Sequence, residues 1–313
     1  MELNVDFRQR TISDEVSCMG TGLHLGNRVK LTIKPAPAGT GINFIRKDLT
    51  GHPVIEARSE NVVDTNLCTS IGNNGSKIST IEHLMAAFFG LGIDNARVEL
   101  DGPEVPIMDG SSAPFIFLLK SVGIKEQRNL KRFVVIKKPF EIQEGNRSVA
   151  VHPSKELKIT YTIDFHHPLL KNQTLDLCFS GKDFIQEISR ARTFGFLKDI
   201  ETLRENGLAK GGSLDNAIVI DDFRIINEDG LRYKDEFVRH KILDFLGDLA
   251  LLGSPVIGHF VVKKSGHFLN QHMLSELLKS KKSWKTLTFQ NPEQCAQNSV
   301  KIPAFGSLGP VPA

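Results

Sequence analysis

The chain has 313 residues, of which 40% are hydrophobic and 24% charged, so it is long enough for about two globular domains with substantial cores. Its 39 basic and 36 acidic side chains give a formal net charge of +3, which is too balanced to predict nucleic-acid binding. We therefore expect no nucleic-acid partner, although a few local basic residues would suffice to bind an anionic small molecule.

The first third of the chain reads as strands and turns followed by helices. Alternating apolar and polar residues predict strands, an Asn-Asn-Gly-Ser stretch predicts a hairpin turn, and apolar stretches that stop at glycine predict helices. In chain order we expect strands at 29–33 and 41–44, the hairpin turn at 73–76, a helix at 80–89, a strand at 95–100 and a helix at 114–123.

A charged break at 125–132 separates these elements from a second set. The second set is expected to comprise strands at 133–136, 148–151 and 157–163, helices at 183–191 and 197–206, a strand at 217–220, a helix at 236–252, a strand at 256–262 and a helix at 269–280. We therefore predict a first domain at 1–127, a second domain at 128–289 and a loose C-terminal tail at 290–313.

Both halves place a group of strands before a helix, a strand and a final helix. This shared order hints at a duplication, although the residue-level similarity between the halves is weak. Strands grouped ahead of helices indicate an α+β fold, in which the helices of each domain cover one face of its sheet.

The long helix expected at 236–252 carries His240, Asp244 and Asp248 at intervals of four residues, so all three lie on one stripe of the helix. Apolar neighbours such as Ile242 place this stripe in surroundings where unpaired carboxylates are costly, and a bound metal ion would remove that cost. The alternative is a solvated helix face with ordinary His–Asp pairing, which the helix considered alone slightly favours.

Glu82 and His83 stand near the start of the helix expected at 80–89. Ser79, three residues before Glu82, completes a capping-box pattern that would explain Glu82 without catalysis. A glutamate beside a ligand histidine would equally suit a general base next to a metal-bound water. His83 lies in an apolar helix, where a histidine is more often a core residue than a ligand. The order Glu-His is not the H-E-x-x-H motif, so a thermolysin-like site is excluded.

Two shorter stretches could complete an active site. His267 follows Gly266 at the end of an expected strand, where it could project into a cleft and donate a proton to a leaving amine. Thr193 precedes Phe194 and Phe196, and its hydroxyl could stabilise an oxyanion beside an apolar pocket. Considered alone, His267 is better explained as an ordinary loop histidine, and the Thr193 stretch is not specific.

In combination, these stretches resemble the bacterial UDP-3-O-acyl-N-acetylglucosamine deacetylase family of lipid A biosynthesis. The match is specific because long separate motifs agree in sequence, order and spacing over residues 8–289. The matching stretches are Gly20-Thr21-Gly22-Leu23-His24, Ile78-Ser79-Thr80-Ile81-Glu82-His83-Leu84, and those at 92–95, 105–111, 189–196, 211–213, 227–232, 236–248 and 264–267.

The resemblance implies two similar α+β domains, each a mainly antiparallel sheet with helices packed on one face, and the helices of the two domains facing each other across the metal. It implies one catalytic Zn²⁺ per chain held by His83, His240 and Asp244, with water in the open position and Fe²⁺ as the alternative metal in the cell. Two histidines and one carboxylate leave a fourth position free, as catalytic zinc requires.

The resemblance also assigns roles around the metal. Glu82 would be the general base, and His267 the general acid, oriented by Asp248. Thr193 and Lys241 would polarise or position the reacting carbonyl. The remaining implied contacts are with substrate: an acyl-chain passage lined by Phe194, Phe196, Ile200, Gly212 and Ser213, and a nucleotide site near Phe165 and Lys264.

The reaction implied by the resemblance is removal of the N-acetyl group from UDP-3-O-acyl-N-acetylglucosamine, giving UDP-3-O-acyl-glucosamine and acetate, the committed step of lipid A biosynthesis. One alternative is a related metal-dependent deacylase that acts on another acylated sugar. A second alternative is a non-enzymic nucleotide-sugar binding protein with a structural metal.

The four cysteines are far apart in the sequence and form no C-x-x-C pair, so no disulfide framework is expected. The first ten residues carry no apolar targeting segment, and no apolar run approaches the roughly 20 residues of a membrane span. We expect a cytoplasmic monomer without stable membrane insertion, whose partner is a small molecule, the acylated UDP-amino sugar.

Overall fold

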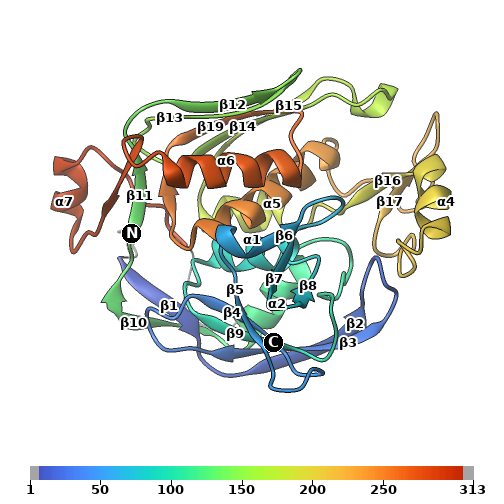
Figure 1. Ribbon diagram of the computed structural model, residues 1–313. Helices are drawn as coiled ribbons and strands as arrows, with labels where there is room; N and C mark the ends of the chain where they lie inside the picture. Colours follow the sequence, from blue (N-terminus) through green and yellow to red (C-terminus); the bar gives the residue numbers. More distant parts are fainter. Residues whose placement is uncertain (1–6, 306–313) are drawn as a thin grey trace.

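A computed structural model describes residues 7–305 of the chain. Within these residues two five-stranded sheets form the outer layers, and the main helices lie between them (Figure 1). The first sheet has the order β2 (Val16–Thr21), β3 (Arg28–Pro35), β9 (Ala96–Leu100), β4 (Ile42–Arg46) and β5 (Val54–Glu56). The second has the order β12 (Phe140–Glu144), β13 (Arg147–His152), β19 (His259–Lys263), β14 (Lys158–Ile163) and β15 (Gln173–Cys178).

The two sheets share one topology. Each is built from two antiparallel hairpins, and a later strand enters between them, antiparallel to one hairpin and parallel to the other. This late strand is β9 in the first sheet and β19 in the second. The structure therefore confirms the α+β class and the two similar, mainly antiparallel halves, and the shared strand order is what a duplicated unit would produce.

Four helices occupy the space between the sheets: α1 (Glu82–Leu91), α2 (Ala113–Ser121), α5 (Glu236–Leu249) and α6 (His267–Lys279). Helix α1 is apolar around most of its circumference, and all ten of its residues are buried, as expected for a helix without a solvated face. It packs directly against α5. A Cβ atom added at Gly247 would lie 2.1 Å from the Glu82 carbonyl oxygen, so the two helices touch at a point where no side chain fits.

Each half carries a small insertion between its second hairpin and its central helix. The first is the sheet of β6 (Val62–Asp64), β7 (Ser70–Asn73) and β8 (Ser76–Ile78), whose hairpin turn was predicted. Asn74 and Gly75 have φ angles of 48° and 81°, as a two-residue type I′ turn requires. The second insertion pairs β16 (Phe194–Phe196) with β17 (Ile218–Ile220) beside α4 (Leu197–Glu205) and projects at one end of the molecule (Figure 1).

The remaining elements lie outside the two five-stranded sheets, the four central helices and the two insertions. They are β1 (Arg8–Ile12) paired with β10 (Ile124–Leu130), the sheet of β18 (Val256–Ile257), β11 (Phe133–Ile136) and β20 (Trp284–Leu287), the helix α3 (Gly181–Asp183) continued by a π-helical turn at Phe184–Ile188, short 3₁₀ turns at Ser59–Asn61, Pro168–Leu170 and Ala250–Leu252, and α7 (Pro292–Gln297).

Two expected elements differ from the structure. The charged segment at 125–132 is not a simple break, because most of it forms β10, whose side chains are mostly exposed while its backbone pairs with β1. The strand expected at 256–262 is interrupted at Gly258, which separates β18 from β19. A Cβ atom there would lie 2.7 Å from Ile136 Cγ1, so the chain passes too close to β11 to carry a side chain.

The C-terminal segment up to residue 305 packs against the rest of the chain, contrary to the expectation of a loose tail. Phe305 is 3% exposed, and its carbonyl oxygen accepts a hydrogen bond from Arg10 Nη1 at 3.1 Å. Its ring lies where a side chain on Gly92 would be, and Lys131 Nζ stands 5.2 Å from the ring centroid. The remainder of the expected tail, residues 306–313, lies outside the described residues.

One apolar core runs through both halves, from the first sheet across α1 and α5 to the second sheet. Among residues 7–305, no helix has both the length and the apolar character needed to cross a lipid bilayer.

Removing the Phe305 side chain is expected to destabilise the fold. We predict that Phe305→Ala lowers the free energy of unfolding by about 3 to 5 kcal/mol, because a buried phenylalanine is replaced by a cavity. Urea denaturation followed by circular dichroism measures the change. Phe223→Ala is the matched control, since Phe223 is 85% exposed and its loss should change stability by less than about 0.5 kcal/mol. Equal, small effects of both changes would contradict the packed segment.

Candidate active site

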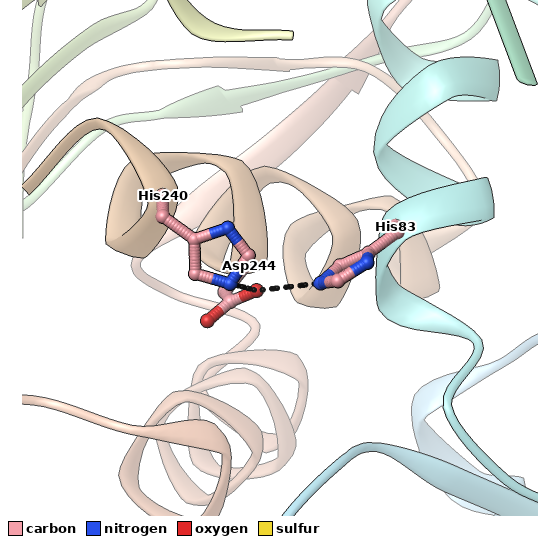
Figure 2. Close-up of side chains that lie close together, drawn as sticks. All are labelled: His83, His240 and Asp244. Atoms are coloured by element: carbon pink, nitrogen blue, oxygen red, sulfur yellow. Dashed lines mark ion pairs between the residues drawn. The ribbon is translucent and has the colours of Figure 1, made fainter. Parts of the chain in front are cut away.

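Three potential metal ligands converge where α1 meets α5. His83 lies in the first turn of α1, and His240 and Asp244 lie one turn apart on α5 (Figure 2). Asp244 Oδ1 is 3.2 Å from His240 Nε2 and 3.5 Å from His83 Nε2, and the two imidazole rings are 5.0 Å apart and nearly perpendicular. Among the described residues these three form the one group of His, Cys, Asp or Glu side chains arranged to share an ion.

The burial of this group decides between the two interpretations of the helix stripe. His240 is 2% exposed, Asp244 3% and Asp248 2%, so the alternative of a solvated helix face is wrong. Asp244 Oδ1 is buried and has no hydrogen-bond donor within the described part of the chain, which is costly for a carboxylate oxygen. A divalent cation between the three side chains would remove that cost, so the residues present fit a metal ion.

Hydrogen bonds prepare His240 and Asp244 for this role. His240 Nδ1 donates to the Ala191 carbonyl oxygen at 3.0 Å, which leaves Nε2 with its lone pair towards Asp244. Burial lowers the pKa of His240 to about 3, so the ring is neutral as a ligand must be. Burial would raise the pKa of Asp244, but neighbouring cationic groups hold it well below its usual range. One of these groups is the ammonium of Lys241, 2.9 Å from Asp244 Oδ2.

Glu82 does not act in a capping box. The residue preceding α1 is Ile81, no side chain caps the helix, and Thr80 has a φ of 58°, which turns Ser79 away from the helix start. Glu82 Oε2 accepts instead from the Thr69 peptide N–H at 3.1 Å, and Oε1 lies 3.7 Å from His267 Nε2. Burial raises the pKa of Glu82, which suits a group that must take up a proton.

His267 is the first residue of α6 rather than the end of a strand, and it faces the metal ligands. Its Nδ1 donates to Asp248 Oδ2 at 2.9 Å, and its Nε2 is 3.9 Å from Asp244 Oδ2. Burial would lower the pKa of His267, but the charges of Asp248 and Glu82 outweigh it and raise the pKa to about 9. The ring is therefore protonated at neutral pH and can donate a proton.

Two residues in this cluster were not anticipated from the sequence. Thr69 Oγ1 donates to Asp248 Oδ1 at 2.5 Å, and Asn270 Nδ2 donates to Asp248 Oδ2 at 2.8 Å. Asn270 lies three residues after His267, so the helical spacing on α6 was an available signal. Thr69 lies at the end of the loop between β6 and β7, far in the sequence from Asp248 and His267, and no local pattern pointed to it.

An apolar cavity of about 510 Å³ extends from His240 into the second insertion. Phe194, Phe196 and Ile200, three of the residues expected along an acyl-chain passage, line it together with Thr193, His240 and Lys241. Phe165 also lies in its wall, with its ring 5.7 Å from that of Phe194. Gly212 and Ser213 do not line this cavity, and a side chain on Gly212 would instead approach Ala209 and Leu23.

A second cavity, of about 850 Å³, lies on the other side of Lys241. It is rich in basic side chains and contains both residues expected near the nucleotide, Phe165 and Lys264. Lys264 forms an ion pair with Asp164 at 2.6 Å. The basic side chains in its lining are Arg147, Lys171, Lys241 and Lys264.

The chain matches a family model described as UDP-3-O-acyl N-acetylglycosamine deacetylase over residues 9–279. Curated proteins named UDP-3-O-acyl-N-acetylglucosamine deacetylase are similar over most of their length. The protein of Saccharophagus degradans is 51% identical over 298 residues, covering 94% of this chain and 98% of the relative. Those of Methylococcus capsulatus and Myxococcus xanthus are 52% and 53% identical, covering 91% and 87% of this chain and 94% and 87% of the relatives.

Metal content should depend on the histidines of both helices. We expect about one divalent ion per purified chain, and we expect His83→Ala and His240→Ala each to lose most of it, because each change removes one of three ligands. Elemental analysis after desalting measures the content. His272→Ala is the control, since this histidine lies exposed on α6. A double variant, His83→Ala with His240→Ala, that keeps its metal would contradict the assignment.

Proposed function

The chain belongs to the UDP-3-O-acyl-N-acetylglucosamine deacetylase family, and we propose that it carries out this deacetylation at a zinc ion held by His83, His240 and Asp244. The enzyme removes the acetyl group from UDP-3-O-acyl-N-acetylglucosamine, giving the free amine and acetate, in lipid A biosynthesis. The observation that supports the metal site is the buried Asp244 Oδ1, which faces two imidazole nitrogens and has no donor among the described residues.

The donor set favours zinc, because two imidazole nitrogens and a carboxylate oxygen are typical ligands of catalytic zinc. Fe²⁺ is the alternative that the same ligands accept. When bound, the ion would supply Lewis acidity, lowering the pKa of a coordinated water towards neutrality and polarising the acetyl carbonyl.

Two proton transfers by side chains complete the hydrolysis. Glu82 Oε1 takes a proton from the water whose oxygen attacks the acetyl carbon. As the carbon–nitrogen bond breaks, His267 Nε2 delivers a proton to the amine nitrogen. Asp248 holds His267 Nδ1, so that the donating nitrogen stays turned towards Glu82 and the metal ligands. The products are acetate and the amine, and the atoms of one water are consumed.

Lys241 and Thr193 are the proposed positioning groups for the carbonyl. Burial would lower the pKa of Lys241, but Asp244 raises it, so the ammonium remains charged beside the metal ligands. A fixed positive charge there stabilises negative charge that develops on the carbonyl oxygen. Thr193 lines the apolar cavity together with His240 and Lys241.

The two cavities suit the two parts of the substrate. A diphosphate favours the basic cavity around Lys264, where charge-assisted hydrogen bonds are strong. An acyl chain favours the apolar cavity around Phe194 and Ile200, since each buried methylene contributes about 0.8 kcal/mol. Lys241 lines both cavities and stands at their junction.

The setting of the enzyme is also part of the proposal. The cysteines at positions 18, 68, 178 and 295 are all free thiols, as is usual in a reducing compartment, and we propose that the enzyme works in the cytoplasm. We further propose that it acts as a monomer on its small-molecule substrate and binds no nucleic acid.

The decisive test is a deacetylation assay on the nucleotide substrate with matched variants. Glu82→Gln should lower kcat by about 10²- to 10⁴-fold and keep metal content and thermal stability, because it removes a proton acceptor that is not a ligand. Turnover of the parent should fall as pH rises through about 9, where His267 loses its proton, and fall at acid pH, where Glu82 gains one. His267→Ala should lose the basic limb and Glu82→Gln the acidic limb.

Controls make this assay interpretable. Glu276→Gln, on α6 outside the site, should keep wild-type turnover, and stripping the metal should abolish activity that returned zinc restores. Nearly full turnover in Glu82→Gln would remove Glu82 as the base. Binding of the nucleotide sugar with no release of acetate would instead indicate a non-enzymic binding protein.

Narrowing the apolar cavity should discriminate between acyl chains. Gly195 lines the cavity, and a Cβ there would meet no atom closer than Ile200 at 3.9 Å, so Gly195→Val adds bulk into open space. We expect kcat/KM for a long-chain substrate to fall at least about tenfold more than for a short-chain analogue, because only the long chain needs the filled volume. Equal losses for the two substrates would contradict the passage.

A further inference from the structure

Thr69 lies between the two groups that the proposed mechanism uses as base and acid. It is 1% exposed and sits in the turn just before β7. Its peptide N–H donates to Glu82 Oε2 at 3.1 Å, and its hydroxyl donates to Asp248 Oδ1 at 2.5 Å. The same hydroxyl oxygen is 3.1 Å from His267 Nδ1. One residue of the first half thus contacts the base and both members of the His–Asp pair.

The backbone holds Thr69 in place. Its carbonyl oxygen accepts from the Ile81 N–H at 3.3 Å, immediately before α1, while its own N–H bonds to the first side chain of α1. The next residue, Ser70, is tied to Ser79 by a hydroxyl–hydroxyl hydrogen bond of 3.0 Å. Hydrogen bonds therefore attach the Thr69 backbone to the start of α1, and the Thr69 hydroxyl contacts α5.

The Thr69 hydroxyl donates one of the three hydrogen bonds that the Asp248 carboxylate accepts from His267, Asn270 and Thr69. Asp248 Oδ2 accepts from His267 Nδ1 and Asn270 Nδ2, and Oδ1 accepts from Thr69. Asn270 is itself fixed by the Ser265 hydroxyl at 2.6 Å. Without the Thr69 hydroxyl, Oδ1 would lose its donor from the first half, and the carboxylate could rotate about its side-chain bond and carry the His267 ring with it.

We propose that Thr69 is a positioning residue for deacetylation: its hydroxyl sets the orientation of His267 through Asp248, and its N–H sets the orientation of Glu82. The proposal rests on the proposed function, because it assigns a task relative to that base and acid. Thr69 thereby keeps the proton acceptor of the first half and the proton donor of the second half in one geometry. Small misplacements of reacting groups lower turnover more than binding.

Two substitutions at position 69 distinguish the effect of the hydroxyl on turnover from an effect on folding. Thr69→Val keeps the shape and the N–H to Glu82 but removes the hydroxyl, and we expect kcat to fall about 10- to 100-fold with KM within about twofold of wild type. Thr69→Ser restores the hydroxyl and should recover turnover to within about threefold. Thr11→Val is the matched control, since Thr11 is also 1% exposed but its hydroxyl oxygen bonds to the Ala36 N–H, away from the site. It should leave kcat unchanged.

A double-mutant cycle tests the route through Asp248. In an Asp248→Ala background, adding Thr69→Val should lower kcat by less than about threefold, because the group that the hydroxyl positions is already gone. If thermal denaturation shows that the Thr69→Val protein is not folded, Thr69→Ala replaces it in both comparisons. Thr69→Ala removes the same hydroxyl without the branched side chain.

Each outcome decides the question. Three outcomes would overturn the positioning role alone. They are wild-type turnover in Thr69→Val, equal losses of turnover in Thr69→Val and Thr69→Ser, and a full additional loss when Thr69→Val is added to Asp248→Ala. Wild-type protein that releases no acetate would overturn the proposed function and, with it, the task assigned to Thr69. A fall in kcat in Thr69→Val, its recovery in Thr69→Ser and an unchanged metal content support the positioning role.

Discussion

The close contact between α1 and α5 at Gly247 is the constraint on which the site depends. Because Gly247 has no side chain, the start of α1 lies against the last turn of α5, where Gly247 immediately precedes Asp248 and follows Asp244 by three residues. Glu82 and His83 are therefore brought beside side chains more than 150 residues away in the sequence. A larger residue at position 247 would separate the helices and move His83 away from its two partners, since helix packing distances follow the side chains at the contact.

Burial determines the electrostatics of this contact. Charged groups removed from water need partners, and the polar and charged side chains of this cluster provide them for one another. Asp244 is held ionised by cationic neighbours, Asp248 is surrounded by donors, and His267 is held protonated by two carboxylates. Glu82 is the exception, because burial raises its pKa and the two histidines beside it compensate incompletely. Such a carboxylate is well suited to take up and release a proton.

The two repeated units and the two insertions contribute different parts of the site. The repeated units supply the sheets and the helices that carry the candidate metal ligands, and each half contributes part of the cluster. The first insertion supplies Thr69 and the turn beside Glu82, and the second supplies the apolar cavity around Phe194. Both insertions lie between the second hairpin and the central helix of their half. The candidate metal ligands, Glu82 and His267 thus lie on buried helices, and the apolar cavity lies in an inserted segment.

Local spacing in the amino-acid sequence was enough to predict the main helices, the strands with the clearest apolar pattern, the hairpin turn at Asn74, and the stripe of His240, Asp244 and Asp248. Family motifs added His83, Glu82 and His267 as an expected set. Which oxygen or nitrogen faces which partner depends on the tertiary structure. It excluded the capping role of Glu82 through the backbone of Thr80, brought Thr69 to Asp248, turned the charged segment at 125–132 into β10, and packed Phe305 against Gly92. These features depend on contacts between segments distant in sequence, and a periodic pattern carries no information about such contacts.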